Sequence, residues 1–317
     1  MYNFVFRSGA KRLMNIIGRR KIWYLISLIL ILPGIVALFL WKIPTGLDFK
    51  GGSLLDIQYK ENVSRDKVQE SVNLSGFSNA NIQLSGDNTY IIKTAPLDQE
   101  NQKKLTDALA KAGEYKQNRL ETVGPTVSND LKKRAIIAVI IASLAIIIYI
   151  SIAFRKVPRP ASSWRFGVCA VLALIHDLLF VFGVFAILGH FLGYEIDSLF
   201  ITALLTIMGF SVHDTIVVFD RIRENLRKSP SLDFETNVNN SILQTLNRSL
   251  NTSFTVLIVL FSLFLLGGAS LKTFTLALLV GIAMGTYSSI FNASPLLVSW
   301  QGWSARRMSR INQKVSS

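Results

Sequence analysis

Six long apolar segments alternate with polar stretches along the 317-residue chain. Crossing the hydrocarbon of a bilayer takes about 20 predominantly apolar residues in a helix, and each of the six meets that length. The segments lie at residues 22–41, 135–154, 166–192, 196–219, 246–266 and 274–297. The pattern therefore predicts an integral membrane protein built around a six-helix bundle.

The polar segment between the first two spans, residues 42–134, has the pattern of a small folded domain. The alternating stretches "SLLDIQY", "NIQLSG" and "TYIIKTA" predict strands, and a turn at Asp87-Asn88 joins the last two as a hairpin. The stretch "KQNRLETVG" is a candidate for a fourth strand.

Two helices are predicted within the same segment. One begins after Ser64, a favourable N-cap, and the other runs from near Asp98 to Gly113, a favourable C-cap. The resulting order β-α-β-β-α-β is typical of the ferredoxin-like α+β fold. That fold hosts many functions, so by itself it indicates none.

The distribution of charge gives the chain an orientation. Half of the residues are apolar, 17% are charged and the formal net charge is +14. A basic chain can bind nucleic acid, but here the basic residues collect in alternate loops, as the positive-inside rule expects of a membrane protein. The basic groups are Arg7, Lys11, Arg12, Arg19, Arg20 and Lys21; Arg155, Lys156, Arg159 and Arg165; Arg221, Arg223, Arg227 and Lys228; and Arg306, Arg307 and Arg310. We expect no nucleic-acid partner, cytoplasmic segments at 1–21, 220–245 and 298–317, and an extracytoplasmic α+β domain.

The sequence "GLDFKGG" stands where the first span gives way to the first strand. Gly46, Gly51 and Gly52 permit tight backbone geometry around Asp48 and Phe49. A plain turn and a contact surface are both open as interpretations. The glycines lack the spacing of a nucleotide-binding loop, and the chain has no Walker pattern. An ATPase is therefore disfavoured, and we expect no cofactor or metal.

Ionisable residues inside the spans carry the candidate chemistry, because each costs roughly 2.5–3.5 kcal/mol to insert. The third span contains His176-Asp177, the fourth contains His213-Asp214, and the fifth contains Arg248. Such groups normally face a bundle interior or water. Simpler interpretations stay open, namely a helix–helix hydrogen bond for either carboxylate and an interfacial position for the arginine.

Helix geometry places Asp214 and Arg248 at similar depths. At about 1.5 Å per residue, Asp214 lies roughly 7 Å and Arg248 roughly 10 Å from the cytoplasmic ends of their spans, if the fifth helix begins near Ser241. We therefore expect the two to pair, with Asp177 lying deeper. Protonation of Asp214 would release Arg248, so the sequence predicts that this carboxylate takes up and loses a proton.

The sixth span carries small residues four positions apart. Gly281, Gly285, Ser289 and Ala293 form a small-xxx-small stripe. Such a stripe lets two helix backbones approach closely, so it predicts a packing face.

Four stretches together, "GLDFKGG", "IHD", "SVHDTIVVFDRIREN" and "TLNRSLNTS", resemble the SecF branch of the SecD/SecF family of protein-export membrane proteins, over essentially the whole chain. The resemblance implies one half of an RND-type transporter, with SecD supplying the other half. It implies that the pair assists the Sec translocon channel and uses the proton gradient to help pull preproteins across a bacterial-type cytoplasmic membrane. Asp214 and Arg248 match the family's membrane Asp and Arg. With His213 and Asp177 they are the candidate proton-relay residues.

Two other classes of protein remain as alternatives. A stand-alone RND-like exporter of lipids or small molecules would act without a partner. An intramembrane aspartyl protease would need Asp177 and Asp214 at one depth, sharing a proton. The depth estimate separates these two carboxylates, so we expect that the protein is not an enzyme.

Overall fold

The computed structural model describes residues 15–86, 88–155, 157–158 and 162–315. The chain divides into two compact units. Thr45–Ile137 form the sheet domain, and the chain up to Pro44 together with the chain from Ala138 onward forms the helical unit. Several predicted features lie outside the described residues, namely Asp87 of the predicted turn and the basic positions Arg7, Lys11, Arg12, Lys156 and Arg159.

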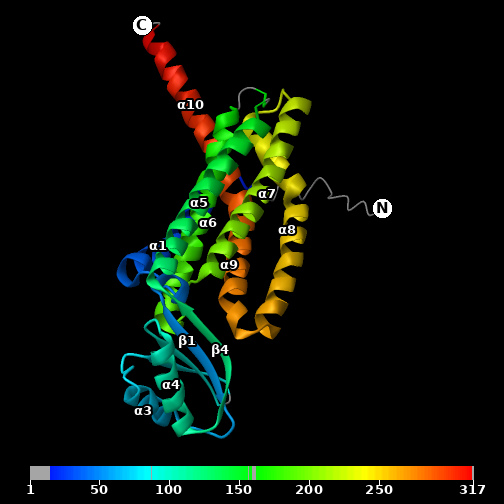
Figure 1. The fold of residues 1–317 in the computed structure, drawn as a ribbon. Helices are drawn as coiled ribbons and strands as arrows, with labels where there is room; N and C mark the ends of the chain where they lie inside the picture. Colours follow the sequence, from blue (N-terminus) through cyan, green and yellow to red (C-terminus); the bar gives the residue numbers. More distant parts are fainter. Residues whose placement is uncertain (1–14, 87, 156, 159–161, 316–317) are drawn as a thin grey trace. The chain divides into compact units, whose positions relative to one another are not determined.

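Six helices of the described chain are long and apolar enough to cross a membrane. They are α1 (Arg20–Trp41), α5 (Pro125–Ala153), α6 (Ser163–Leu192), α7 (Ser198–Lys228), α8 (Phe234–Leu266) and the rod that begins with α9 (Lys272–Ser288) (Figure 1). A 3-10 turn, η2 (Ala269–Leu271), precedes this rod, which continues through a π-helical turn, η3 (Ser289–Ala293), into α10 (Ser294–Val315). The predicted helical membrane protein is thereby confirmed.

The region 220–245, predicted as a loop, is mostly helix. α7 continues to Lys228, and α8 begins at Phe234 rather than near residue 246. Asp233 sets this start, because its side chain accepts a hydrogen bond from the backbone N–H of Thr236 at 2.9 Å. Val238 and Ile242 in the early turns of α8 are buried in the core of the helical unit, and Phe234 packs against it. These apolar residues are four positions apart within a polar stretch, so the helix start was not predicted.

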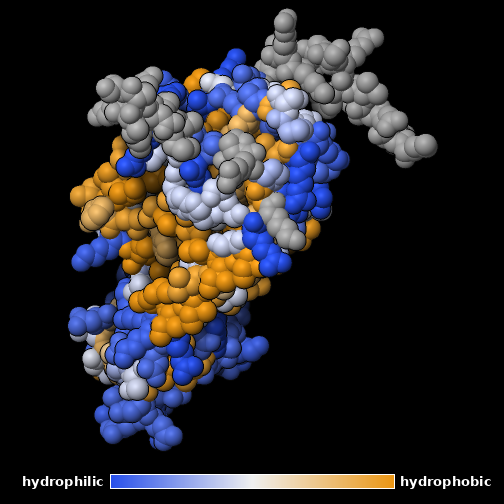
Figure 2. Space-filling view, turned by 90° about the horizontal axis from the view of Figure 1, so that it is seen from above, coloured by the Kyte–Doolittle hydropathy of each residue, from blue (hydrophilic) through white to orange (hydrophobic). Residues whose placement is uncertain are grey.

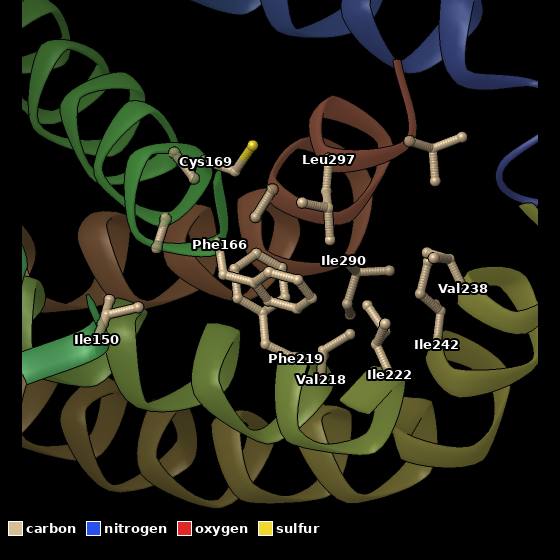
Figure 3. Close-up of a cluster of buried hydrophobic side chains, with 14 of the residues drawn as sticks. Ile150, Phe166, Cys169, Val218, Phe219, Ile222, Val238, Ile242, Ile290 and Leu297 are labelled. Atoms are coloured by element: carbon tan, nitrogen blue, oxygen red, sulfur yellow. The ribbon is translucent and has the colours of Figure 1, made fainter. Parts of the chain in front are cut away.

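The core of the helical unit at the charged end of α7 is apolar and aromatic. Phe166 and Phe219 lie at its centre, with ring centroids 4.9 Å apart, and Phe154 stacks on Phe166 at 5.3 Å. Ile222 of α7 packs here with Ile242 of α8 (Figure 3). This cluster ties four helices together close to the end of the bundle.

On the face drawn in Figure 2, hydrophobic residues form a broad band between hydrophilic regions. Exposed apolar side chains are frequent along α1, α5 and α8, and Phe39, Ile141 and Phe254 are examples. In the most apolar 18-residue stretch of α5 only 6% of the residues are buried, against 50% in that of α7. A soluble protein rarely exposes so large an apolar surface, so these faces suit contact with lipid.

α1 makes its close contacts with helices that come much later in the chain. It crosses α6 at Gly34 and Gly183, where a Cβ added to Gly34 would lie 2.7 Å from the Cα of Gly183. Ser27 of α1 donates a hydrogen bond to the Oδ1 of Asn292 at 2.8 Å. Tyr24 shares a hydrogen bond of 3.0 Å with Ser299 of α10.

The sheet domain has the element order predicted from the sequence. It contains β1 (Gly52–Tyr59), α3 (Arg65–Leu74), β2 (Asn81–Gly86), β3 (Thr89–Thr94), α4 (Gln99–Ala112) and β4 (Tyr115–Val123). The strands form one antiparallel sheet in the order β2-β3-β1-β4. This β-α-β-β-α-β arrangement is the ferredoxin-like split unit, which confirms the predicted α+β domain.

Local capping explains where the two helices of the sheet domain begin and end. Ser64 and Asp98 each accept a hydrogen bond from the backbone N–H three residues later, at 3.4 and 2.8 Å. Gly113 ends α4 with an extended backbone, not with the left-handed conformation common at C-caps. A Cβ at Gly113 would lie 3.1 Å from the side chain of Val63, so close packing explains this glycine.

One apolar core joins α3 and α4 to the sheet. Its fully buried members include Leu55, Ile57, Val68, Val72, Ile92, Leu105 and Leu109. Two tyrosines enter the core and use their hydroxyls there. Tyr59 donates to the carbonyl of Leu109 at 3.2 Å, and Tyr90 donates to the carbonyl of Val63 at 2.6 Å. Burial of a tyrosine therefore comes with a partner for its polar end.

The junction motif, for which a plain turn and a contact surface were both open, forms one turn of helix, α2 (Leu47–Lys50). Gly46 precedes it, Asp48 lies in its first turn and Phe49 is buried. Gly51 and Gly52 then take φ values of +74° and +138°, which side chains rarely adopt. A Cβ at Gly52 would also lie 2.5 Å from the carbonyl oxygen of Thr94. The two glycines are therefore required by the entry into β1.

Candidate functional site between the membrane helices

α7 and α9 approach closely along two matched rows of residues four apart. A Cβ added to Gly281 would lie 2.2 Å from Ile207, and one added to Gly285 would lie 2.9 Å from the Cβ of Ser211. One turn further, Ser289 shares a hydrogen bond of 2.8 Å with Thr215. The small-residue stripe of the sixth span, which also includes the buried Ala293, thus faces α7 at its first three positions.

Asp177 of α6 lies fully buried beside this contact, with 0% of its surface exposed. Its Oδ2 accepts hydrogen bonds from Ser211 of α7 at 2.6 Å and from Ser288 of α9 at 2.7 Å. The Nδ1 of His176 lies 3.0 Å from its Oδ1. One carboxylate therefore joins three helices.

Asp214 of α7 is also buried, with 3% of its surface exposed, and it faces α8 and α9. The hydroxyl of Ser253 lies 3.4 Å from its Oδ2 and shares a second hydrogen bond of 2.6 Å with Thr286 of α9. Because Ser211 precedes Asp214 by three residues, the two carboxylates lie about one helical turn apart along α7. Among the described residues they share no hydrogen bond, so the geometry of a protease dyad is not present.

The predicted ion pair between Asp214 and Arg248 is wrong for this conformation. No described acidic side chain forms an ion pair with Arg248, which is exposed on α8. The residue of α8 that meets Asp214 is Ser253, five positions later and therefore about 140° further around the helix. Ser253 also lies about 7.5 Å further along α8 than Arg248, so the contact that Asp214 makes matches neither the depth nor the direction expected for Arg248.

His213 is exposed, whereas its neighbour Asp214 is buried. Adjacent helix positions differ by about 100° in direction, so only one of the pair can face the bundle interior. His176 is mostly buried and contacts the neighbouring carboxylate. The two His-Asp pairs are therefore not equivalent.

Hydroxyl residues complete the site, and sequence reasoning missed most of them. Ser211, Ser253, Thr286 and Ser288 hold the two carboxylates, and all four are buried. A serine or threonine in an apolar span costs little free energy to insert and occurs often. Its presence alone therefore does not indicate a functional site. Spacing offers one clue, since Ser211 precedes Thr215 by four residues and both face α9.

The chemistry available here is binding and release of a proton by a carboxylate. A buried carboxyl group whose partners are hydroxyls can stay protonated or ionise when water or a cation approaches. The π-helical turn η3 begins at Ser289, directly beside the site, and π-helical turns are frequent at functional positions. Within the described residues, no group of three or more His, Cys, Asp or Glu side chains could hold a metal ion.

These features define a class of protein, namely helical membrane proteins with buried carboxylates in the bundle and a ferredoxin-like domain between the first two spans. A family described as protein export membrane protein SecD/SecF, C-terminal, matches residues 102–303. The chain belongs to this SecD/SecF family, as its motifs indicated.

Relatives with known names resemble the chain over most of its length. A protein translocase subunit SecF of Thermobaculum terrenum is 45% identical over 91% of this chain and 94% of the relative. One from Anaerolinea thermophila is 41% identical over 96% of this chain and 100% of the relative. A crystal structure of SecDF from Thermus thermophilus superposes with a TM-score of 0.80 at 34% identity, over 91% of this chain and 39% of that chain.

A second solved structure, SecDF in a super-membrane-facing form, gives a TM-score of 0.67 at 33% identity and covers 95% of this chain. The present chain thus spans about two-fifths of the SecDF chains that it matches.

Proposed function

We propose that this protein is a subunit of the Sec protein-export machinery and works with SecD, the Sec translocon channel and a translocating preprotein. The names of its relatives support the subunit role. The likeness to SecDF supports the partnership, because about three-fifths of that longer chain has no counterpart here. Co-purification from native membranes tests it. A partner of SecD size is expected to co-purify. Lipid export by the protein without any partner would favour the stand-alone exporter.

We propose that the machine is driven by the proton gradient and that Asp214 carries the proton. One elementary charge that crosses the membrane potential contributes about 2.3 kcal/mol per 100 mV. The observation behind this proposal is the burial of Asp214 inside the bundle with hydroxyl partners from two neighbouring helices. Asp177 is the second proton-binding carboxylate of the relay. Arg248 and His213 belong to the relay at its exposed side.

The orientation follows from charge. Six spans put both ends of the chain on one side, and the basic loops favour the cytoplasm for that side. The sheet domain then lies outside the cytoplasm, where a preprotein emerges. Labelling of Asn88→Cys by an impermeant thiol reagent in intact cells is expected to succeed, while Ser231→Cys stays unlabelled. The reverse pattern contradicts the orientation.

The central experiment replaces Asp214 by Asn, which cannot ionise and has almost the same volume. In inverted membrane vesicles we expect loss of the export that depends on the gradient, with ATP-driven export unchanged after the gradient is collapsed. Arg248→Met is expected to act in the same direction. Asp130→Asn, the same chemical change at an exposed position of α5, serves as the control. If the Asp214→Asn variant keeps full gradient-dependent export, the proton-relay proposal is wrong.

A further inference from the structure

A cavity of about 520 Å³ opens between the ends of α5, α7 and α8, and among its lining residues only Arg248 has a role in the relay proposed above. It lies in the helical unit at the basic end of α7. Its lining residues are Tyr149, Ala153, Phe154, Ile216, Val217, Asp220, Arg221, Arg223, Glu224, Gln244, Thr245 and Arg248. The size suits part of a small amphipathic molecule.

The cavity has one apolar and one polar wall. α5 contributes Tyr149 and Ala153, Phe154 follows directly after α5, and α7 contributes Ile216 and Val217. α8 faces them with amide and hydroxyl groups and a guanidinium, and the last turns of α7 add charged side chains. A molecule that fills the whole space must therefore be apolar at one end and polar at the other.

The polar wall has one positive charge in excess. Three arginines line the cavity, and two of them are balanced within it, since Arg221 pairs with Glu224 at 2.6 Å and Arg223 pairs with Asp220 at 2.5 Å. Arg248 lies within electrostatic reach of Asp214 but forms none of the ion pairs found among the described residues. The net charge of the lining is thus +1, which suits a monoanion.

The groups around Arg248 are already fixed in place. Arg221 Nε donates to the Oε1 of Gln244 at 2.5 Å, and Asn225 donates to the same oxygen at 2.9 Å. Gln244 and Arg248 are four residues apart, so they share one face of α8. Two donors thereby hold the Oε1 of Gln244, and this leaves the amide N–H groups of Gln244 to donate to an anion placed beside Arg248.

The membrane supplies molecules of this kind at this level. The cavity lies where the apolar spans end in basic residues, which is the depth of lipid headgroups. Basic pockets between membrane helices on the cytoplasmic side bind anionic headgroups. We infer that this cavity binds an anionic phospholipid, with its phosphate on Arg248 and an acyl chain against Tyr149 and Val217.

The test titrates the full chain, purified in an uncharged detergent, with phosphatidylglycerol. Bound lipid is counted by native mass spectrometry and its effect is followed as a rise in melting temperature. Arg248→Gln removes the charge, and Val217→Trp fills the apolar part while leaving every charge in place. Arg248→Gln is expected to weaken lipid binding about tenfold, the size of one charge-assisted contact. Val217→Trp is expected to weaken it about tenfold as well, because the indole occupies the space of the acyl chain. Arg227→Gln removes an arginine from the same end of α7 outside the cavity and is expected to bind as the wild type does.

Two further arms identify the ligand. Phosphatidylcholine and inorganic phosphate are both expected to bind at least about tenfold more weakly than phosphatidylglycerol, because the first lacks net charge and the second lacks an apolar part. Inorganic phosphate that binds as tightly as the lipid would overturn the lipid assignment in favour of a free-anion site. Equal binding of the two lipids, or lipid binding unchanged in both cavity variants, would overturn the site itself.

Discussion

The sheet domain and the helical unit are packed with opposite chemistry. Inside the sheet domain the buried side chains are almost all apolar, and its buried polar side chains among the described residues are serines. Inside the helical unit, α7 and α9 meet through glycines and hydroxyls, and two carboxylates are buried beside them.

The difference follows from the solvent of each unit. Water drives apolar side chains together, so the sheet domain can be stabilised by burial at about 25 cal/mol per Å². Lipid tails give no such preference, so membrane helices associate through close backbone approach and interhelical hydrogen bonds. A polar interior is therefore tolerated in the helical unit, and a site that moves protons can be built into the packing itself.

The largest effect is expected from a truncation in the apolar core. Leu105→Ala removes a fully buried side chain of α4 and is expected to lower the free energy of unfolding by about 2–5 kcal/mol. The measurement is denaturant unfolding of a fragment covering residues 45–124, followed by circular dichroism. The exposed Leu84→Ala is the control. A wild-type fragment without a cooperative transition contradicts the independence of the domain.

In the helical unit an added side chain should destabilise more than a removed one. Gly285→Leu drives a side chain into Ser211, which already lies 2.9 Å from a Cβ at that position, and is expected to cost about 1–3 kcal/mol. Gly209→Leu makes the same change in α7 where no atom lies within 4 Å. Thermal melting in detergent should separate them, and equal melting temperatures would mean that the α7–α9 contact is loose.

Alkaline pH should weaken the sheet domain through its buried tyrosines. Burial raises the pKa of Tyr59 and also that of Tyr115. Below the ordinary tyrosine value of about 10 both states are protonated, so stability is flat. Above it the unfolded chain loses the proton first, and stability falls by about 1.4 kcal/mol per pH unit for Tyr59, whereas the partly exposed Tyr115 contributes less. Unfolding of the 45–124 fragment between pH 8 and 11 measures the slope, which should be reduced in Tyr59→Phe.

The smallest effect is expected from a single hydroxyl. Ser288→Ala removes one of the two hydroxyl donors to Asp177. Interhelical hydrogen bonds in membrane proteins contribute about 0.6 kcal/mol on average and at most about 1.7. Ser262→Ala, on an exposed face of α8 where the hydroxyl bonds only to its own helix, is the control. A loss comparable to that of Gly285→Leu would show that Asp177 is a structural hub.

Features encoded over a few residues were predictable. The caps at Ser64 and Asp98, the strand alternation and the six apolar spans depend on neighbours in sequence, so the pattern alone indicated them. The start of α8 at Phe234 was missed because its apolar positions lie four apart inside a polar stretch. The helical turn at Leu47–Lys50 is too short to show any periodicity.

The site was half predictable. The cost of an ionisable group in a span follows from the sequence, and it singled out Asp177 and Asp214, which are both buried. The relative height of two helices and the direction around each one depend on how the helices pack, and for this reason the ion pair with Arg248 was wrong. Which hydroxyls meet the carboxylates, and where the helix widens into a π-turn at Ser289, depends on the same packing.

The crossing of α1 and α6 at Gly34 and Gly183 also constrains the order of biosynthesis. Every close partner of α1 described above lies at least 140 positions later in the chain, so α1 enters the bilayer long before α6 and α9 are synthesised. Meanwhile the whole sheet domain emerges and can fold, because its contacts are complete within Thr45–Ile137. During this interval the first membrane helix therefore lacks the helices that pack against it, and Ser27 lacks its partner Asn292. A chaperone or insertase that shields α1 during this interval would matter more for this protein than for one whose first two helices pack as a hairpin.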